Sequence, residues 1–464
     1  MYSWVLFIYV GVILAIGFGT ARYVKTLEDF ALAGRNLSFP VLLGTLFASY
    51  VGGATVIGWT GSFYSLGIDW WFTAAGALLG VAAAAFIMSE RCRRLEQYTV
   101  PDLLELRYDA KTRVIGSLMI ILGDVSLIAV QTISIAGVLT AYFGWERIPA
   151  MIFATVVFMA IALVGGMIGV AITDAVQAVI IAAGLMVGVG AAFSHAGGFT
   201  AMLSSLPPGF LSPLSNLAPR LAFNNAIAVF GTVAVWQSII FSRVFAAKDV
   251  KTAKRGVVWL IPAGFLAYFL VAMLGYSARV ILGPGVPAGS VFAKLVTEVL
   301  SPGVAVVLLA VVIGAIITTV NSILLSVSVN FTRDLYQKLF RKNADSKELL
   351  FVGRASVLVV SLLAFLLAAA MPDIVSAIVF TYTMYSAALL VPLYGGYLWK
   401  RATAAAGLLG VISGAGTALT WYLLKNPLGL PPMIPSIIIS LVVFVVASLL
   451  TPEPSKEQLK VFDV

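Results

Sequence analysis

The sequence predicts an all-α integral membrane protein with about thirteen transmembrane helices. Hydrophobic residue types make up 61% of the 464 residues and charged types only 11%, and long apolar windows recur along the whole chain. A soluble domain is about a quarter charged, because its surface faces water. So few charges cannot cover a core of this size, and we therefore expect lipid to surround most of the chain.

Thirteen windows are long enough to be spans, since a helix needs about twenty apolar residues to cross the hydrocarbon core. They run over residues 3–21, 39–66, 70–89, 114–142, 148–164, 168–194, 223–246, 256–281, 303–336, 351–370, 374–397, 403–424 and 434–451. The first window has no basic region before it, so a retained first span is expected rather than a cleaved signal peptide.

The basic residues divide between the two sides of the predicted membrane. If the N-terminus is outside, all but five of the 29 Lys and Arg residues, Arg243 included, fall on the inner side. Cytoplasmic loops have this excess of positive charge. The five outer residues are Arg147, Arg220, Arg279, Lys294 and Lys425. We therefore expect a multi-pass plasma-membrane protein with its N-terminus outside and its C-terminus in the cytoplasm.

Cysteine and histidine are too scarce for several kinds of site. The single cysteine, Cys92, excludes an intramolecular disulfide. With His195 as the one histidine, no zinc cluster or Ser-His triad can be assembled. We therefore expect neither an enzyme nor a cofactor. The net charge of +9 does not indicate a nucleic-acid partner, because the basic residues lie in inner loops. Cys92 is expected in such a loop, where a thiol reagent would reach it from the cytoplasm.

Two stretches within predicted spans are unusual for a lipid environment. Gly52-Gly53 lies in the middle of the span 39–66, where either an unwound helix or close packing through small residues would explain it. Residues 318–322, Thr-Thr-Val-Asn-Ser, bring four polar side chains to membrane depth. Ser and Thr can bond back to their own helix. Neutral hydroxyl and amide oxygens are also what a desolvated alkali cation needs, so a cation site is the alternative.

Only two acidic residues, Asp124 and Asp174, lie well inside predicted spans. A carboxylate at this depth is costly and is a functional-site hypothesis by default. Asp174 is near an inner end and could instead reach water, and Asp124 could be protonated or bonded to a hydroxyl such as that of Ser126. No Arg or Lys is expected in the core, which argues against a substrate site built on a carboxylate–guanidinium pair.

Four stretches resemble signatures of the sodium:solute symporter family, in the right order between residue 27 and about residue 340. They are residues 27–35 (LEDFALAGR), 165–177 (GGMIGVAITDAVQ), 243–248 (RVFAAK), and 318–322 (TTVNS) followed by 332–336 (TRDLY). The resemblance implies a LeuT-type fold with two five-helix inverted repeats, one extra helix before them and two after. The implied parts are residues 1–38, the first repeat 39–194, an extracellular loop 195–222, the second repeat 223–397, and residues 398–464.

The resemblance also implies site residues. Sodium would be held by the backbone carbonyls of Ala48, Val51 and Ala315 and the hydroxyls of Thr318 and Thr319. A second sodium, present in some members, would use Asp174, Thr318, Asn321 and Ser322, with Asn321 standing where those members have serine. The substrate would lie along Tyr50, Gly52, Thr55 and Gln237. Asp124 departs from the family and would mark an amine or another hydrogen-bond donor in the substrate.

The function implied by the resemblance is sodium-coupled symport of a small organic solute into the cell by alternating access, by a monomer. Sodium would be the coupling ion and no other cofactor is expected. Amino acids, monocarboxylates, vitamins and sugars all stay open as solutes. One alternative is a proton-coupled transporter of the same fold, with Asp124 and Asp174 as the relay. A membrane-embedded enzyme is the other alternative, and it would need a catalytic constellation that the sequence does not offer.

Overall fold

The computed structural model describes residues 3–371, 374–424, 426–427 and 430–462. Side chains are described for these residues except 3–6, 21, 164, 374–381 and 384. Among the described residues, helices are the regular secondary structure, and the only β pairing is an isolated parallel bridge between Leu37 and Ala247. The predicted all-α class is therefore confirmed.

The helices fall into long elements that can cross a bilayer and short elements that connect them. The long ones are α1 (Ser3–Thr20), α8 (Ala110–Phe143), α9 (Arg147–His195), α13 (Val250–Leu282), α15 (Pro302–Asn330), α16 (Ser346–Ala370), α17 (Ile374–Leu398), α18 (Ala404–Leu423) and α19 (Met433–Leu450). The shorter ones are α2 (Leu27–Leu32), α3 (Phe39–Tyr50), α4 (Thr60–Leu66), α5 (Trp70–Ala83), α6 (Ser89–Arg94), α7 (Val100–Arg107), α10 (Phe199–Ser204), α11 (Pro219–Ala234), α12 (Ser242–Ala246), α14 (Ala288–Lys294) and α20 (Lys456–Leu459). Wider, π-helical segments include η3 (Ala54–Trp59), η5 (Ala84–Met88), η6 (Gln237–Phe241), η7 (Leu295–Val299) and η8 (Phe331–Phe340).

Each of the thirteen predicted windows lies mainly in helical segments, although two of them share one element and others include a break. By length and composition, eight helices of the described chain can cross a membrane, or nine if the bent pair Pro219–Ala234 and Gln237–Ala246 counts as one span. Phe7–Thr20, Phe39–Tyr50 and Arg147–Leu163 are apolar but shorter. The exact number of spans therefore stays a prediction.

The two windows 148–164 and 168–194 belong to the one element α9, which bends at Gly166. This glycine has φ 50° and ψ −160°, a backbone conformation that residues with a side chain rarely adopt. A Cβ at Gly166 would also lie 3.1 Å from the Cα of Phe30 in α2. The Gly165-Gly166 pair therefore redirects the chain and lets α2 pack against the bend.

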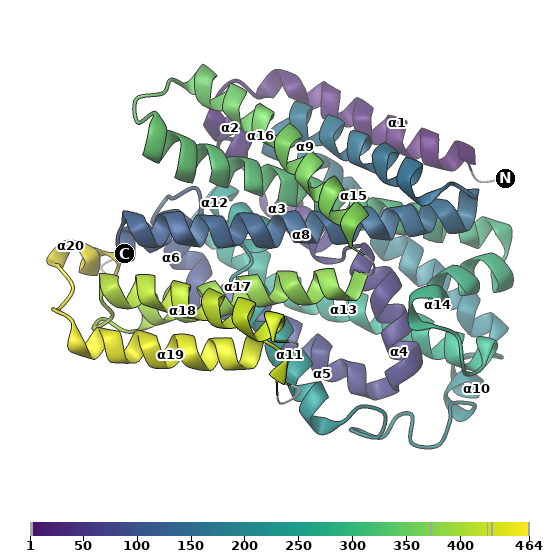
Figure 1. Cartoon of the computed structure of the whole chain (residues 1–464). Coiled ribbons are helices and arrows are strands. Elements are labelled where there is room, and N and C mark those ends of the chain that lie inside the picture. Colours follow the sequence, from purple (N-terminus) through teal and green to yellow (C-terminus); the bar gives the residue numbers. More distant parts are fainter. Residues whose placement is uncertain (1–2, 372–373, 425, 428–429, 463–464) are drawn as a thin grey trace.

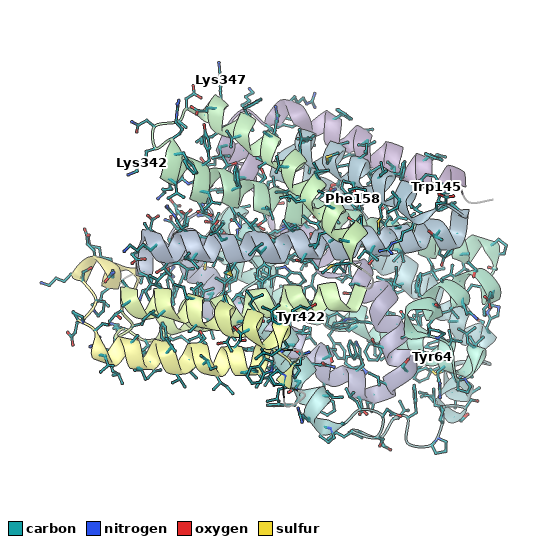
Figure 2. The ribbon with its side chains drawn as sticks, viewed as in Figure 1. Tyr64, Trp145, Phe158, Lys342, Lys347 and Tyr422 are labelled. Carbon is teal, nitrogen blue, oxygen red and sulfur yellow. The ribbon has the colours of Figure 1, made fainter. Side chains whose placement is uncertain are left out.

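The bundle has two distinct ends (Figure 1). The start of α1, the α14 region and α10 lie at one end, which we call the α14 end, and α20 lies at the other. Lys342 and Lys347 lie at the α20 end (Figure 2), which we call the basic end, whereas Trp145 and Tyr64 lie toward the α14 end. Residues that the predicted orientation places on opposite sides of the membrane therefore lie at opposite ends of the bundle.

Helix α15 forms the centre of the bundle. Every one of its residues from Val311 to Asn330 is buried, and it packs against α9, α8 and α3. The most apolar windows of α18 and α19 are only 33% buried, so these two helices lie at the periphery. The polar stretch 318–322 is thus in the middle of the protein, away from lipid.

Candidate functional site

The helix of the second predicted span is interrupted next to α15. α3 ends at Tyr50, Val51 has φ −91° and ψ 67°, and the chain resumes helical hydrogen bonding at η3. A Cβ at Gly52 would lie 2.6 Å from Thr319 Oγ1, and a Cβ at Gly53 would lie 2.2 Å from Ile316 Cγ1. Both explanations for the glycine pair therefore hold, since the helix is broken and its bare backbone packs tightly on α15.

Backbone carbonyls of α3 meet the hydroxyls of α15 at this break. Thr318 Oγ1 donates to Ala48 O at 2.8 Å and to Ala315 O at 3.1 Å. Thr319 Oγ1 donates to Ala315 O at 2.8 Å and to Ser49 O at 3.1 Å. The structure thus brings together four of the five predicted sodium residues, and Val51 ends α3 one turn further on.

This oxygen set suits a monovalent cation. All its members are neutral carbonyl or hydroxyl oxygens, and the residues are at most 2% exposed. A hydroxyl can rotate its proton away and offer a lone pair to a cation. The sequence analysis missed Ser49, whose carbonyl accepts from Thr319. The position of Ser49 close to the Gly52–Gly53 pair could have indicated it from the sequence.

Arg243 corrects the expectation that the core holds no basic residue. Its side chain is fully buried, with Nη1 donating to Ser238 O at 2.5 Å and Nη2 donating to Ser49 Oγ at 3.2 Å and to Ser322 Oγ. Arg243 is in α12, which continues from η6 and carries the guanidinium back into the bundle. The expectation of a core without Arg or Lys was wrong, because hydropathy cannot separate a loop from a helix end that packs inside.

Asp174 is the acidic partner of this guanidinium. Its Oδ2 lies 3.5 Å from Arg243 Nη2 and accepts from Thr45 Oγ1 at 2.6 Å and from Ser49 Oγ at 3.0 Å. The side chain is 1% exposed, which excludes the alternative that it reaches water. The carboxylate therefore belongs to a buried polar network that joins α3, α9, α12 and α15.

The residues predicted for a second sodium are only partly brought together. Ser322 Oγ lies 3.5 Å from Asp174 Oδ2 and donates to Thr318 O at 2.8 Å. The amide of Asn321 is buried without a hydrogen-bond partner among the described residues. Thr318 turns its hydroxyl to α3 instead. The second sodium stays a prediction.

The predicted substrate residues lie on different sides of the break. The ring centroids of Tyr50 and Tyr268 are 5.7 Å apart, and those of Tyr268 and Trp59 are 4.4 Å apart. Thr55, in η3, is 9% exposed. These aromatic rings form one wall beside the broken helix.

Gln237 and Asp124 gather around the second broken helix, where α11 and η6–α12 bend by 40°. Gln237 Oε1 accepts from Val100 N at 2.8 Å, so this side chain ties the break to the start of α7. Asp124 Oδ1 accepts from Ser238 Oγ at 2.9 Å and from the hydroxyl of Tyr385. The alternative of a hydroxyl partner for Asp124 therefore holds, but Ser126, the example given for it, donates to Leu122 O at 3.0 Å instead.

Gln131 is a residue that the sequence analysis missed. It is 2% exposed, its amide lies against the positions where Gly52 and Gly53 would carry a Cβ, and its Oε1 has no hydrogen-bond partner among the described residues. Gln131 follows Asp124 by seven residues, which puts both on one face of α8. That spacing could have revealed it.

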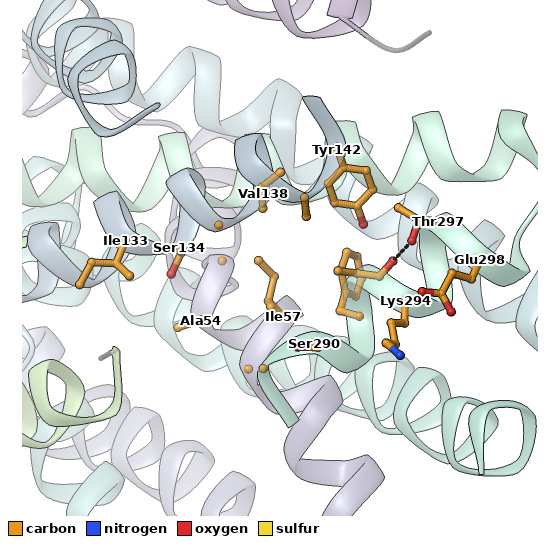
Figure 3. A pocket seen from close by; sticks show the side chains of 17 residues that line it. Ala54, Ile57, Ile133, Ser134, Val138, Tyr142, Ser290, Lys294, Thr297 and Glu298 are labelled. Carbon is orange, nitrogen blue, oxygen red and sulfur yellow. Dashed lines mark hydrogen bonds between the residues drawn. The ribbon is translucent and has the colours of Figure 1, made fainter. Parts of the chain in front are cut away.

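A cavity of about 570 Å³ extends from the break at Gly52–Gly53 to α14. Its lining includes Gly53 and Ile57 of the broken span, Ser134 and Tyr142 of α8, and Glu298 of η7 (Figure 3). Ser134 lies at one end, and Tyr142, Thr297 and Glu298 lie at the other. The cavity therefore gives access to the break from one end of the bundle.

At the basic end, the start of α7 holds two spans together. Thr99 Oγ1 donates to Asp334 Oδ1 at 3.0 Å, while Val100 binds Gln237 as described above. Asp102, one turn into α7, is 2% exposed, and its burial raises the pKa of the carboxyl. α7 thus links η6 and η8 on the side opposite the cavity.

The sodium:solute symporter family model matches residues 30–414. This chain belongs to the sodium:solute symporter family. It is 29% identical to the sodium/proline symporter of Escherichia coli (strain K12), covering 98% of this chain and 94% of the relative. It is 26% identical to the osmoregulated proline transporter OpuE of Bacillus subtilis (strain 168), covering 98% and 96%.

The fold agrees with this membership. The structure of a Na⁺-coupled sialic acid symporter in a substrate-bound, outward-open state superimposes with a TM-score of 0.85 over 97% of both chains, at 17% identity. The predicted LeuT-type fold and sodium-coupled symport are therefore confirmed. Sodium is the coupling ion of the family, and the relatives are named as transporters and symporters.

Proposed function

We propose that this symporter carries a small zwitterionic amino acid of the proline type together with sodium. Relatives named for proline transport match nearly the whole chain. The cavity of about 570 Å³ falls within the range of roughly 300–1,000 Å³ typical of small-molecule sites. Its lining is mainly apolar with a few polar groups, which suits the hydrocarbon part of such a solute.

The observation that carries the sodium assignment is the meeting of α3 carbonyls with α15 hydroxyls. We assign one sodium to Ala48, Val51, Ala315, Thr318 and Thr319. A cation there would join the broken span to the centre of the bundle, and so would favour the conformation in which both face each other. The substrate would then lie beside the same break, near Gly52, Tyr50 and Thr55.

A second sodium at Asp174, Thr318, Asn321 and Ser322 would have to compete with Arg243. The guanidinium lies 3.5 Å from the Asp174 carboxylate and also donates to Ser322. One positive charge already balances this carboxylate, so we expect a single sodium per cycle.

The direction of transport follows from the proposed orientation. Lys342 and Lys347 lie at the basic end, and an excess of Lys and Arg marks the cytoplasmic side. We therefore propose that the basic end faces the cytoplasm of a plasma-membrane protein, with the N-terminus outside, the C-terminus inside and the cavity opening outward. Transport would be inward, and a monomer would suffice because the described site lies within one chain.

A proton-coupled transporter is the second candidate, and Asp124 is the observation that favours it. This buried carboxylate has no basic partner among the described residues, and it could carry a proton instead. Uptake into liposomes under either a sodium or a proton gradient separates the two. Uptake driven by the proton gradient alone would contradict the sodium proposal.

Thr319→Val tests the sodium assignment, because valine keeps the shape of threonine and removes its hydroxyl. We expect the sodium concentration for half-maximal uptake to rise about tenfold, the order expected for one lost contact to a charged group. The measurement is uptake of labelled proline by purified protein in liposomes at varied sodium.

The matched control is Thr132→Val. Thr132 is also buried at membrane depth, but its hydroxyl donates at 2.9 Å to Ile128 O of its own helix. We expect this variant to keep the sodium dependence of the parent protein. If both variants respond alike, or if Thr319→Val leaves the sodium dependence unchanged, then Thr319 is not a sodium residue.

A further inference from the structure

Asp124 is a fully buried carboxylate with one oxygen left without a partner. Its Oδ1 accepts from Ser238 and Tyr385, whereas Oδ2 has no hydrogen-bond partner in the described part of the chain. None of the ion pairs formed by described residues involves Asp124. Buried polar atoms are almost always hydrogen-bonded, so this oxygen lacks a binding partner.

Asp174 also has one oxygen, Oδ1, without a hydrogen-bond partner among the described residues, so the difference between the two carboxylates lies in the cation. Asp174 is equally buried, and it has Thr45 and Ser49 as donors and Arg243 as its cation. Asp124 has a comparable pair of hydroxyl donors but no cation. What is missing at Asp124 is therefore a positively charged group that donates a hydrogen bond.

Asp124 does not line the cavity, but it lies on the face of α8 that reaches the cavity at Ser134. Ser134, Gln131 and Asp124 occupy one face of α8, because their separations of three and seven residues match the helical period. Ser134 lines the cavity, Gln131 lies against the Gly52–Gly53 backbone, and Asp124 follows about 10 Å further along the helix. The stripe therefore leads from the cavity, past the first broken helix, to the second.

Three separate elements meet at the carboxylate. Asp124 comes from α8, Ser238 from η6 just after the second break, and Tyr385 from α17. The two hydroxyls hold Oδ1, which leaves Oδ2 available to another donor. A ligand bound to Oδ2 would therefore contact a carboxylate that links the second broken helix to α8 and α17.

We propose that Asp124 Oδ2 is the subsite for the protonated amine of the substrate. This proposal rests on the proposed function and adds to it the residue that binds the protonated amine of the substrate. An ammonium N–H donates to Oδ2 and its charge balances the carboxylate. A solute that lacks the amine leaves this oxygen unpaired and binds more weakly.

The wild-type protein provides the first test. Purified protein in liposomes with an inward sodium gradient takes up labelled L-proline in competition with unlabelled L-proline or tetrahydrofuran-2-carboxylate, in which an ether oxygen replaces the amine. We expect the ether analogue to compete at least about thirtyfold more weakly, the order of a lost buried charge contact. Equal competition overturns the subsite.

Variants provide the second test. In Asp124→Asn, which keeps shape but cannot be charged, we expect the preference for proline over the ether analogue to disappear, with sodium still raising the melting temperature. The matched control is Asp69→Asn. Asp69 is also a fully buried carboxylate, but it accepts from Leu214 N, Asn216 N and Leu217 N of an adjacent loop. This control should keep the preference.

The outcomes separate this inference from the symport proposal. The subsite is overturned if Asp124→Asn still prefers proline over the ether analogue, or if the protein takes up a solute without an amine under a sodium gradient. Neither result contradicts symport. Uptake that does not respond to the sodium gradient contradicts symport. If Asp124→Asn keeps the preference for proline but changes the pH dependence of uptake, Asp124 is a proton site and the subsite is overturned. If Asp124→Asn does not fold, the wild-type competition decides, since equal competition by the ether analogue overturns the subsite.

Discussion

Removing the cation of the buried ion pair should destabilise the protein strongly. Arg243→Met leaves the Asp174 carboxylate without a positive partner, while methionine fills part of the volume. Breaking a buried pair from one side costs about 3–5 kcal/mol. The separation of 3.5 Å between Nη2 and Oδ2 is longer than the ~2.8 Å of a strong charge-assisted bond. We therefore expect the lower end, about 3 kcal/mol.

The assay is the free energy of unfolding of purified protein in mixed micelles with a rising fraction of SDS. The double variant Arg243→Met with Asp174→Asn removes the stranded charge, so we expect it to recover about 2 kcal/mol relative to the single variant. Lys254→Met is the control, because the Lys254–Glu90 pair is partly exposed, at 40% and 43%, and such pairs contribute about 0–1 kcal/mol. The reasoning is refuted if Arg243→Met is as stable as Lys254→Met, or if the double variant is no more stable than the single one.

Two further predictions concern packing and topology. Gly414→Ala would put a Cβ 1.8 Å from Ala387 O where α18 meets α17, so we expect it to lower the stability of the protein by about 1–3 kcal/mol. Gly416→Ala is the control, because its Cβ would meet open space. Equal melting temperatures of the two variants would contradict this packing. Cys92 is fully buried, so it cannot report topology. In a Cys92→Ala background, a membrane-impermeant thiol reagent should label Ser205→Cys but not Lys342→Cys in intact cells, and the reverse pattern would invert the proposed orientation.

The sequence alone predicted the features that depend on the scarcity of polar groups in lipid. The apolar windows, the break at Gly52-Gly53 and the polar stretch at Thr318–Ser322 could be identified because each departs from what a lipid-facing helix tolerates. The order of the signature stretches identified the family. These signals are local, so they survive without any knowledge of which helices touch.

Only the tertiary structure decided which polar groups meet. Arg243 is placed by sequence at the end of a span, but the bend of η6 and α12 carries it into the core beside Asp174, 69 residues away. Asp124 finds Tyr385 at a separation of 261 residues, where neither hydropathy nor spacing indicates a partner. Helix positions relative to one another are set by packing over the whole bundle. The pairings that charge and orient the site are therefore properties of the fold, whereas the residue types that make a site possible are properties of the sequence.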